Sequence, residues 1–175
     1  MKEITEAAKK VKLLVTDVDG VMTSGEVILL ESGEEVKIWS VRDRFAFVGM
    51  RQFLPHIKTA WITGRSSKQV ELRAAELGID FLVQSSADKK AALDEILAKL
   101  NLTYEDVAFA GDDIIDIPLL LRAGLSICPA DGVDEAKAAA KYVSRHAGGK
   151  GVIRELIEII MKAQGKWSEV LEKYS

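Results

Sequence analysis

Residues 11–23, VKLLVTDVDGVMT, decide the fold of this chain. The stretch begins with an apolar run, Val11 to Val15, that is interrupted by a single lysine. A short continuous run of this kind is typical of a strand buried inside a parallel sheet. Two carboxylates, Asp17 and Asp19, follow the run directly and precede a glycine. The stretch therefore predicts a buried strand whose carboxyl end presents two acids at one edge of a sheet.

Further apolar runs repeat this pattern along the chain, at Thr59–Ile62, Phe81–Val83, Val107–Ala110, Leu125–Ile127 and Tyr142–Val143. Helical patterns occupy residues 1–10, Lys68–Leu77, Asp88–Leu100, Ile115–Arg122 and Val152–Lys162. Alternating strands and helices predict an α/β fold, with a parallel sheet covered by helices on both faces. One segment breaks the alternation. Gly25–Leu30 and Glu35–Ser40 are strand-like runs around a turn, which predicts a β-hairpin directly after the first strand.

Length and composition exclude several classes of protein. A chain of 175 residues, 48% hydrophobic and 29% charged, predicts one domain over 1–175. The net charge of −3 provides no general basic field for nucleic acid. No apolar run reaches the roughly 18 residues of a membrane span, so no membrane partner is expected. Residues 1–12 lack the apolar core of a signal peptide, and we expect a cytoplasmic protein. The single cysteine, Cys128, excludes a disulfide framework and a cysteine-rich zinc site.

Polar side chains follow the predicted strands at four places. Asp17 and Asp19 follow the first strand, Thr63 follows the strand at 59–62, Asp88 and Lys89 open a helix, and Asp112, Asp113 and Asp116 follow the strand at 107–110. Taken singly, each has a structural explanation as a solvated turn, a helix cap or acids at a helix N-terminus. Because the carboxyl ends of parallel strands meet at one edge, we expect these groups to come together.

Together these groups fit phosphoryl transfer through an aspartyl-phosphate. Asp17 would attack phosphorus, and Asp19 would protonate the leaving oxygen and then deprotonate the hydrolytic water. Thr63 and Lys89 would hold the phosphoryl oxygens. A divalent cation is needed to offset several acids and a phosphate dianion, and hard oxygen ligands favour Mg²⁺ as the cofactor.

The motifs D-x-D-G-V-x-T, I-T-G-R, D-K and G-D-D-x-x-D, in this order, resemble the haloacid dehalogenase-like superfamily of aspartate-nucleophile phosphatases over nearly the whole chain. The resemblance implies a Rossmann-like fold. It implies a metal held by the Asp17 carboxylate, the Asp19 backbone carbonyl and the Asp112 carboxylate. It also implies that Asp113 supports Lys89 or a metal-bound water, while a structural role at the helix start is expected for Asp116.

No cap domain is expected. The hairpin and one helix fill the interval from Asp17 to Thr63, and one helix and one strand fill the interval from Thr63 to Lys89. The site is therefore open in a monomer, and a macromolecular substrate or another subunit must exclude water from it. A phosphomutase, which needs a cap to turn its intermediate, is disfavoured.

Among capless families, the chain resembles the 3-deoxy-D-manno-octulosonate (KDO) 8-phosphate phosphatases, through Val41-Arg42-Asp43 and the late glycine segment 148–151. The resemblance implies a sugar-phosphate substrate, a role in lipopolysaccharide precursor synthesis and a homotetramer. It further implies that the hairpin flap, residues 24–41, assembles with its copies and that the C-terminal tail, residues 148–175, reaches toward a neighbour's site. We expect Ile38 and Trp39 to be exposed in the monomer and buried between subunits.

Carried over residue by residue, the substrate contacts fall on Asp19, Ser40, Val41, Arg42, Asp43, Arg44, Arg65, Arg73 and Lys89. The segment Arg44–Val48 departs from the family pattern, which has glycine at the position of Arg44 and a basic residue at that of Val48. A phosphatase for another acidic sugar, such as a nine-carbon sialic-type 9-phosphate, therefore stays open. A non-catalytic oligomerisation module of a sugar-nucleotide pathway is a more distant alternative.

Overall fold

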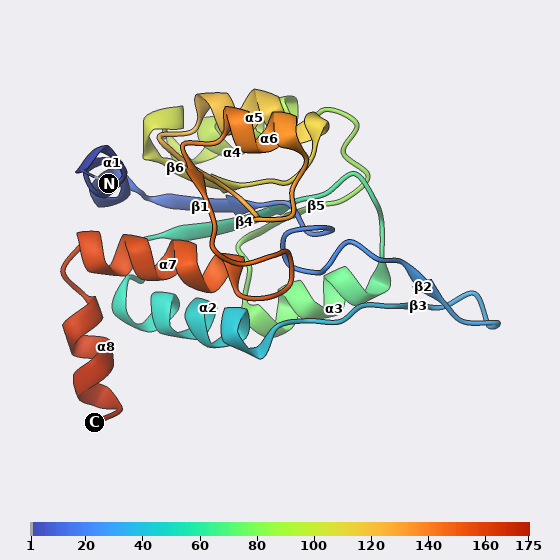
Figure 1. Cartoon of the computed structure of the whole chain (residues 1–175), viewed down its shortest axis with the longest axis horizontal. Helices are drawn as coiled ribbons and strands as arrows, with labels where there is room; N and C mark the ends of the chain where they lie inside the picture. Colours follow the sequence, from blue (N-terminus) through green and yellow to red (C-terminus); the bar gives the residue numbers. More distant parts are fainter. Residues whose placement is uncertain (1) are drawn as a thin grey trace.

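Figure 1 shows the computed structural model, which describes residues 2–175. Its main sheet has the order β5-β4-β1-β6-β7-β8, and all neighbouring strands are parallel. The strands are β1 (Leu13–Thr16), β4 (Lys58–Ile62), β5 (Phe81–Val83), β6 (Val107–Ala110), β7 (Leu125–Cys128) and β8 (Tyr142–Val143). The predicted parallel α/β sheet is confirmed, and β1 lies at its centre.

Helices cover both faces of this sheet (Figure 1). One face carries α2 (Val41–Phe53), α3 (Lys68–Leu77) and α7 (Val152–Ala163), with α1 (Lys2–Lys10) and α8 (Trp167–Lys173) joined to the same core. The other face carries α4 (Lys89–Leu100), α5 (Ile117–Arg122) and α6 (Asp134–Ala139). In β1, Leu14 packs into the first core, and Leu13 and Val15 pack into the second. The strand alternates its side chains between two buried faces, which explains its continuous apolar run.

Local signals explain several helix ends near the strand ends. Asp88 accepts a hydrogen bond from Ala91 N at 3.0 Å and caps α4, which makes Lys89 the first residue of that helix. Gly78 ends α3 in the left-handed conformation, with φ of 64°. Two short 3₁₀ turns, η1 (Tyr104–Asp106) and η2 (Ile114–Asp116), precede β6 and α5.

The expected absence of a cap domain agrees with the topology. Only the hairpin β2 (Ile28–Leu29) and β3 (Glu35–Val36) and the helix α2 lie between β1 and β4. The hairpin projects away from the body of the molecule (Figure 1). Its strands pair over only two residues each, so its ladder is shorter than the sequence predicts. None of the helices within residues 2–175 is long and apolar enough to cross a membrane.

The two apolar residues at the base of the hairpin differ in environment. Ile38 is exposed, as expected, with 64% of its surface accessible. The expectation for Trp39 is wrong: its ring stacks on the buried Trp61 at a centroid distance of 5.9 Å and packs against the core. Trp39 therefore anchors the hairpin to its own chain, because a large aromatic ring at this position meets the apolar underside of β4.

Candidate active site

Residues that continue the strands by one position form the edge of the site. Asp17 N donates to Ala110 O at 2.9 Å, which extends the β1–β6 pairing. Thr63 N donates to Val83 O at 2.9 Å, which extends the β4–β5 pairing in the same way. The backbone of both residues is therefore held by the sheet, and both side chains are buried at its carboxyl edge.

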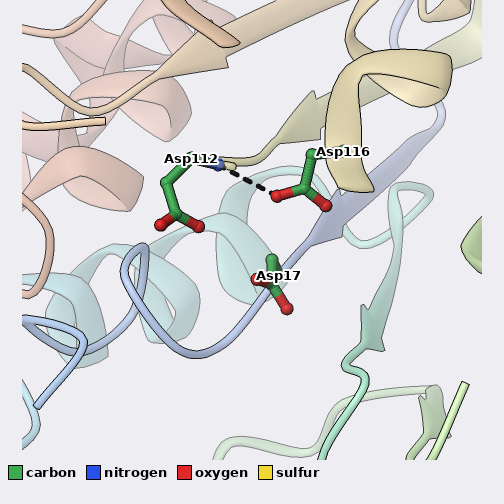
Figure 2. A group of neighbouring side chains, drawn as sticks. All are labelled: Asp17, Asp112 and Asp116. Carbon is green, nitrogen blue, oxygen red and sulfur yellow. Dashed lines mark hydrogen bonds between the residues drawn. The ribbon is translucent and has the colours of Figure 1, made fainter. Parts of the chain in front are cut away.

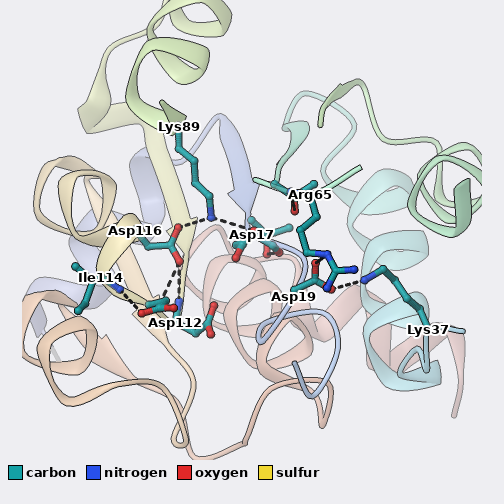
Figure 3. A network of polar contacts seen from close by, with 11 residues as sticks. Asp17, Asp19, Lys37, Arg65, Lys89, Asp112, Ile114 and Asp116 are labelled. Carbon is teal, nitrogen blue, oxygen red and sulfur yellow. Dashed lines mark hydrogen bonds and ion pairs between the residues drawn. The ribbon is translucent and has the colours of Figure 1, made fainter. Parts of the chain in front are cut away.

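Lys89 forms ion pairs with an acid that follows β1 and with an acid that follows β6. Its Nζ donates to Asp116 Oδ1 at 2.7 Å and lies 3.0 Å from Asp17 Oδ1 (Figure 3). All three side chains are less than a tenth exposed. Although burial lowers the pKa of Lys89, the carboxylates of Asp17 and Asp116 raise it above its ordinary value. The lysine is therefore a fixed positive charge beside Asp17.

Asp116, and not Asp113, supports Lys89. Asp116 also accepts hydrogen bonds from the N–H groups of Asp112 and Asp113, at 3.0 and 3.3 Å. Asp113 is exposed, and its side chain accepts from Ile114 N at 2.7 Å. The role expected for Asp113 toward Lys89 is thus corrected, because the 3₁₀ turn after β6 places Asp116 beside the lysine. The alternative role of Asp113, toward a metal-bound water, stays a prediction.

Gly20 brings the loop after β1 against Asp112. Its φ is +87°, and a Cβ atom built on it would lie 2.1 Å from Asp112 Oδ2. Only glycine combines this left-handed backbone with such a close approach. The loop that contains Gly148 and Gly149 packs closely against the loop after β1. A Cβ on Gly148 would lie 2.0 Å from Gly20 O, and Gly149 N donates to Val21 O at 2.9 Å. The close approach of these glycines therefore holds the loop after β1 beside Asp112.

The positive charge of Lys89 does not fully offset the negative charges of the carboxylates in the site. Burial is the largest influence on Asp17 and raises its pKa to about 7, against the lowering effect of Lys89. Burial, followed by the charges of Asp17 and Asp116, raises the pKa of Asp112 to about 8. Bringing these carboxylates together as anions is costly without a further positive charge.

A divalent cation fits this place. Carboxylate oxygens of Asp17, Asp112 and Asp116 lie within 4.8 Å of one another (Figure 2). Asp116 is occupied by Lys89 and two backbone N–H groups. Asp112 Oδ1 is buried and, within residues 2–175, has no hydrogen-bond partner. Asp17 and Asp112 are therefore the side chains available to a hard, oxygen-preferring ion such as Mg²⁺.

The side chain of Asp19 belongs to a separate network on the hairpin side (Figure 3). Lys37 Nζ contacts Asp19 Oδ1 and lies 2.9 Å from Glu35 Oε1. Arg65 Nη2 lies 3.3 Å from Glu35 Oε1, and Arg65 Nε lies 4.0 Å from Asp19 Oδ2. Sequence reasoning missed Lys37 and Glu35. The available signal was their spacing of two, which places both on one face of the hairpin strand.

The remaining predicted contacts lie on α2 and α3, and the structure does not join them to the acids. Asp43 is buried and accepts from Arg154 N at 2.7 Å, which ties α2 to the start of α7. Arg44 and Arg73 both pair with Glu76, at 3.0 and 2.6 Å. Arg73 also lies over the ring of Trp39, with 5.8 Å from its guanidinium carbon to the ring centroid.

The other three residues of this set stand at the start of α2. Ser40 caps the helix by accepting from Asp43 N at 3.4 Å, and Val41 and Arg42 are exposed. The exposed fraction of Val41, the first residue of α2, is 76%.

Comparison with known proteins agrees with this geometry. Residues 58–156 match the model of a haloacid dehalogenase-like hydrolase family. The 3-deoxy-D-manno-octulosonate 8-phosphate phosphatase KdsC of Escherichia coli strain K12 is 41% identical over 168 residues, covering 95% of this chain and 88% of that protein.

Solved structures show the same relationship. The 3-deoxy-D-manno-octulosonate 8-phosphate phosphatase of Moraxella catarrhalis, in complex with a magnesium ion, a phosphate ion and KDO, superposes with a TM-score of 0.96 at 35% identity, covering 100% of this chain and 99% of that one. A probable YrbI-family phosphatase from Pseudomonas syringae gives a TM-score of 0.95 at 37% identity, covering 99% and 98%. The chain belongs to the haloacid dehalogenase-like hydrolases and, within them, to the family of the 3-deoxy-D-manno-octulosonate 8-phosphate phosphatases.

Proposed function

We propose that the protein is a Mg²⁺-dependent phosphatase that hydrolyses KDO 8-phosphate to KDO and inorganic phosphate. The observation that carries the proposal is the buried Asp17 beside Lys89, with the uncompensated Asp112 next to both. Identity of 41% over 95% of the chain makes KDO 8-phosphate the substrate of choice. A role in lipopolysaccharide precursor synthesis, in the cytoplasm, is part of the proposal.

The reaction runs in two steps on the chain's own carboxylates. Asp17 attacks phosphorus and forms an acyl phosphate, while the bond from phosphorus to the sugar oxygen breaks. Asp19 gives its proton to that oxygen, so the sugar leaves as an alcohol. Asp19, now a carboxylate, takes a proton from the water that attacks phosphorus, and the bond from phosphorus to the Asp17 oxygen breaks. Inorganic phosphate leaves, and both aspartates return to their starting states.

Thr63 and Lys89 are assigned to the phosphoryl oxygens. The Thr63 hydroxyl lies at the end of β4, beside β1, and Lys89 stands next to the nucleophile. Their backbones are fixed by sheet and helix hydrogen bonds, so they are oriented before substrate binds. Asp116 holds Lys89 in place, with its Oδ1 accepting from the lysine Nζ at 2.7 Å.

Mg²⁺ is the cofactor, and Asp17 and Asp112 would hold it with the backbone carbonyl of Asp19. When bound, it supplies positive charge that offsets the carboxylates and the phosphate dianion. The crowding of Asp17, Asp112 and Asp116 supports this assignment, because two of the three have strongly raised pKa values.

We also propose that the active unit is a homotetramer assembled through the hairpin flap, residues 24–41, of a single catalytic domain. Apolar side chains of this flap are exposed in the isolated chain: Val27, Ile28, Leu29, Leu30, Val36 and Ile38. A contiguous apolar patch of this kind is typical of an interface. The tail differs, because α8 buries Val170 and stacks Trp167 under Arg154 of its own chain. The exposed apolar side chains of the flap support it as the interface, while the reach of the tail toward a neighbour's site stays a prediction.

Phosphate release from a panel of sugar phosphates tests the substrate. KDO 8-phosphate is expected to be the best substrate, with activity lost on chelation and restored by Mg²⁺. The nine-carbon sialic-type 9-phosphate is the second arm, because Arg44 replaces the family's glycine in the substrate segment. Higher kcat/KM for the nine-carbon substrate would replace the proposed one. No release from any substrate, with the Asp17→Asn variant as background, would contradict a phosphatase.

A further inference from the structure

Lys37, at the end of the hairpin, forms an ion pair with Asp19, the proposed acid–base residue. The side chain of Lys37 is 1% exposed, although it follows a two-residue strand of a projecting hairpin. A lysine is rarely buried to this extent unless it is paired. It pairs with Asp19, which lies 18 residues earlier in the chain, and with Glu35, which lies two residues earlier in β3.

The pairing is asymmetric at Asp19. Lys37 takes one oxygen, Oδ1. The other oxygen, Oδ2, is buried and has no hydrogen-bond partner within residues 2–175, although Arg65 Nε lies 4.0 Å away. One oxygen is thus held by Lys37, while the second makes no hydrogen bond and is the atom left to carry a proton. This is the arrangement that a carboxylate needs to act repeatedly in one orientation.

Glu35 is the second carboxylate that pairs with Lys37. Burial raises the pKa of Glu35, but the hydrogen bond and charge of Lys37, together with Arg65, lower it below its ordinary value. Glu35 is therefore an anion at neutral pH and holds Lys37 from behind. Asp17 has its own lysine, Lys89, on the opposite side of the site (Figure 3). Each of the two reacting carboxylates is paired with a different buried lysine.

We propose that Lys37, backed by Glu35, is a positioning residue that keeps Asp19 turned toward the leaving oxygen and away from the metal-binding acids. The inference rests on the proposed phosphatase function, in which Asp19 first donates and then accepts the proton. It also gives the hairpin a second task, because Lys37 stands between the exposed Val36 and Ile38 of the flap. Removing Lys37 should impair proton transfer more than phosphate binding.

The test uses Lys37→Met in the full-length protein with Mg²⁺. Aryl phosphates of rising leaving-group pKa, from p-nitrophenyl to phenyl phosphate, are compared with KDO 8-phosphate. Nitrophenolate leaves without a proton, whereas the sugar alkoxide cannot. We therefore expect kcat/KM for KDO 8-phosphate to fall about 10²-fold, and that for p-nitrophenyl phosphate to change by less than about tenfold. The dependence of log kcat/KM on leaving-group pKa should become steeper.

A second readout follows from the second half of the reaction. With Asp19 misplaced, hydrolysis of the acyl phosphate becomes slow, so p-nitrophenyl phosphate should give a burst of nitrophenol close to one equivalent per site. Lys37→Arg keeps a cation and should restore most of the loss on KDO 8-phosphate. Glu35→Gln should shift both readouts in the same direction but less. Lys68→Met removes an exposed lysine that pairs with Glu71 on the helix surface, and it is the matched control expected to behave as wild type.

The outcomes separate the two proposals. Equal losses of kcat/KM on all substrates, or an unchanged leaving-group dependence without a burst, would overturn the positioning role and leave the phosphatase intact. A wild-type protein inactive on every phosphate ester would overturn the proposed function and this inference with it. A thermal melt of each variant shows whether a loss comes from unfolding, and a Glu35→Gln protein with wild-type stability then decides the case if Lys37→Met does not fold.

Discussion

Replacing Asp112 by asparagine should stabilise the metal-free protein and abolish its thermal response to Mg²⁺. Burial and the neighbouring Asp17 and Asp116 raise the pKa of Asp112 to about 8, so its charged form is unfavourable in the fold. Asparagine has nearly the same shape and carries no charge. Asp112 Oδ1 has no hydrogen-bond partner within residues 2–175, so little is lost there in the exchange.

The size of the effect follows from the shift. The ordinary value is 3.8, and each unit of pKa corresponds to about 1.36 kcal/mol. If Asp112 were fully buried, the substitution would raise the free energy of unfolding by about 4 kcal/mol at pH 7. Asp112 is only partly buried, so solvent screening reduces the expected gain to about 1–2 kcal/mol, or roughly 2–8 °C in Tm for a chain of this size.

The pH dependence has a definite sign. Because the folded pKa is raised, the unfolded chain gives up its proton first, and stability is lost as pH rises from about 4 to about 8. The difference between variant and wild type should therefore be small near pH 4 and largest above pH 8.

Thermal denaturation in EDTA and in increasing Mg²⁺, at pH 5 and pH 8, measures both effects. Wild type should gain stability with Mg²⁺ as expected for a ligand that binds the native state only. Asp112→Asn should start higher in EDTA and gain little. The comparison variant is Asp113→Asn, since Asp113 is exposed, caps the following turn and raises the pKa of Asp112 less than Asp17 and Asp116 do; it should shift the melt less than Asp112→Asn does. A lower Tm for Asp112→Asn in EDTA, or an undiminished response to Mg²⁺, would refute the reasoning.

Further predictions concern the nucleophile, the loop geometry, the flap and a buried acid. Asp17→Asn should lose steady-state phosphate release while keeping the circular dichroism spectrum of the wild type, because an amide forms no acyl phosphate; turnover near wild type would reject Asp17. Gly20→Ala should weaken Mg²⁺ binding and lower activity, since its Cβ would collide with the Asp112 carboxylate. A titration of activity with Mg²⁺ should then reach half-maximum at a higher concentration than in the wild type. Ile38→Glu should yield smaller species by light scattering, with Lys68→Met as the unchanged control; an identical mass for the Ile38 variant would exclude the flap as the interface. Glu155→Gln should lower Tm at pH 7, because Glu155 accepts from Ser144, Tyr142 and Arg145, and their hydrogen bonds, outweighing the effect of burial, lower its pKa to about 2. That difference should shrink as pH falls from about 4.5 toward 2, where the wild-type carboxyl also becomes neutral; a difference independent of pH would contradict it.

The six parallel strands follow from local pattern. Short apolar runs such as 107–110 and 125–127, separated by amphipathic segments, permit few arrangements other than a sheet buried on both faces. Helices α6 and α8 escaped the prediction. The sequence 134–139 has only Ala136 as a buried residue, and α8 has only Val170, so neither segment has a strong helical apolar stripe.

The candidate site shows where local pattern stops. The gathering of Asp17, Thr63, Lys89 and Asp112 could be predicted, because parallel strands end at one edge and the order of the motifs places each group after a strand or at a helix start. The choice of Asp116 over Asp113 as the partner of Lys89 could not, since it depends on the direction of a 3₁₀ turn three residues long.

The sequence by itself therefore determined the sheet, the acids at its edge and the family resemblance, since all three rest on residue type and spacing along the chain. Only the tertiary structure decided that Trp39 packs inward on Trp61 and that Lys37 reaches Asp19 from the hairpin. These contacts join segments whose relative position depends on how the base of the projecting hairpin packs against the sheet edge. Spacing along the chain specifies which face of an element a side chain occupies, but packing between elements determines what that face meets.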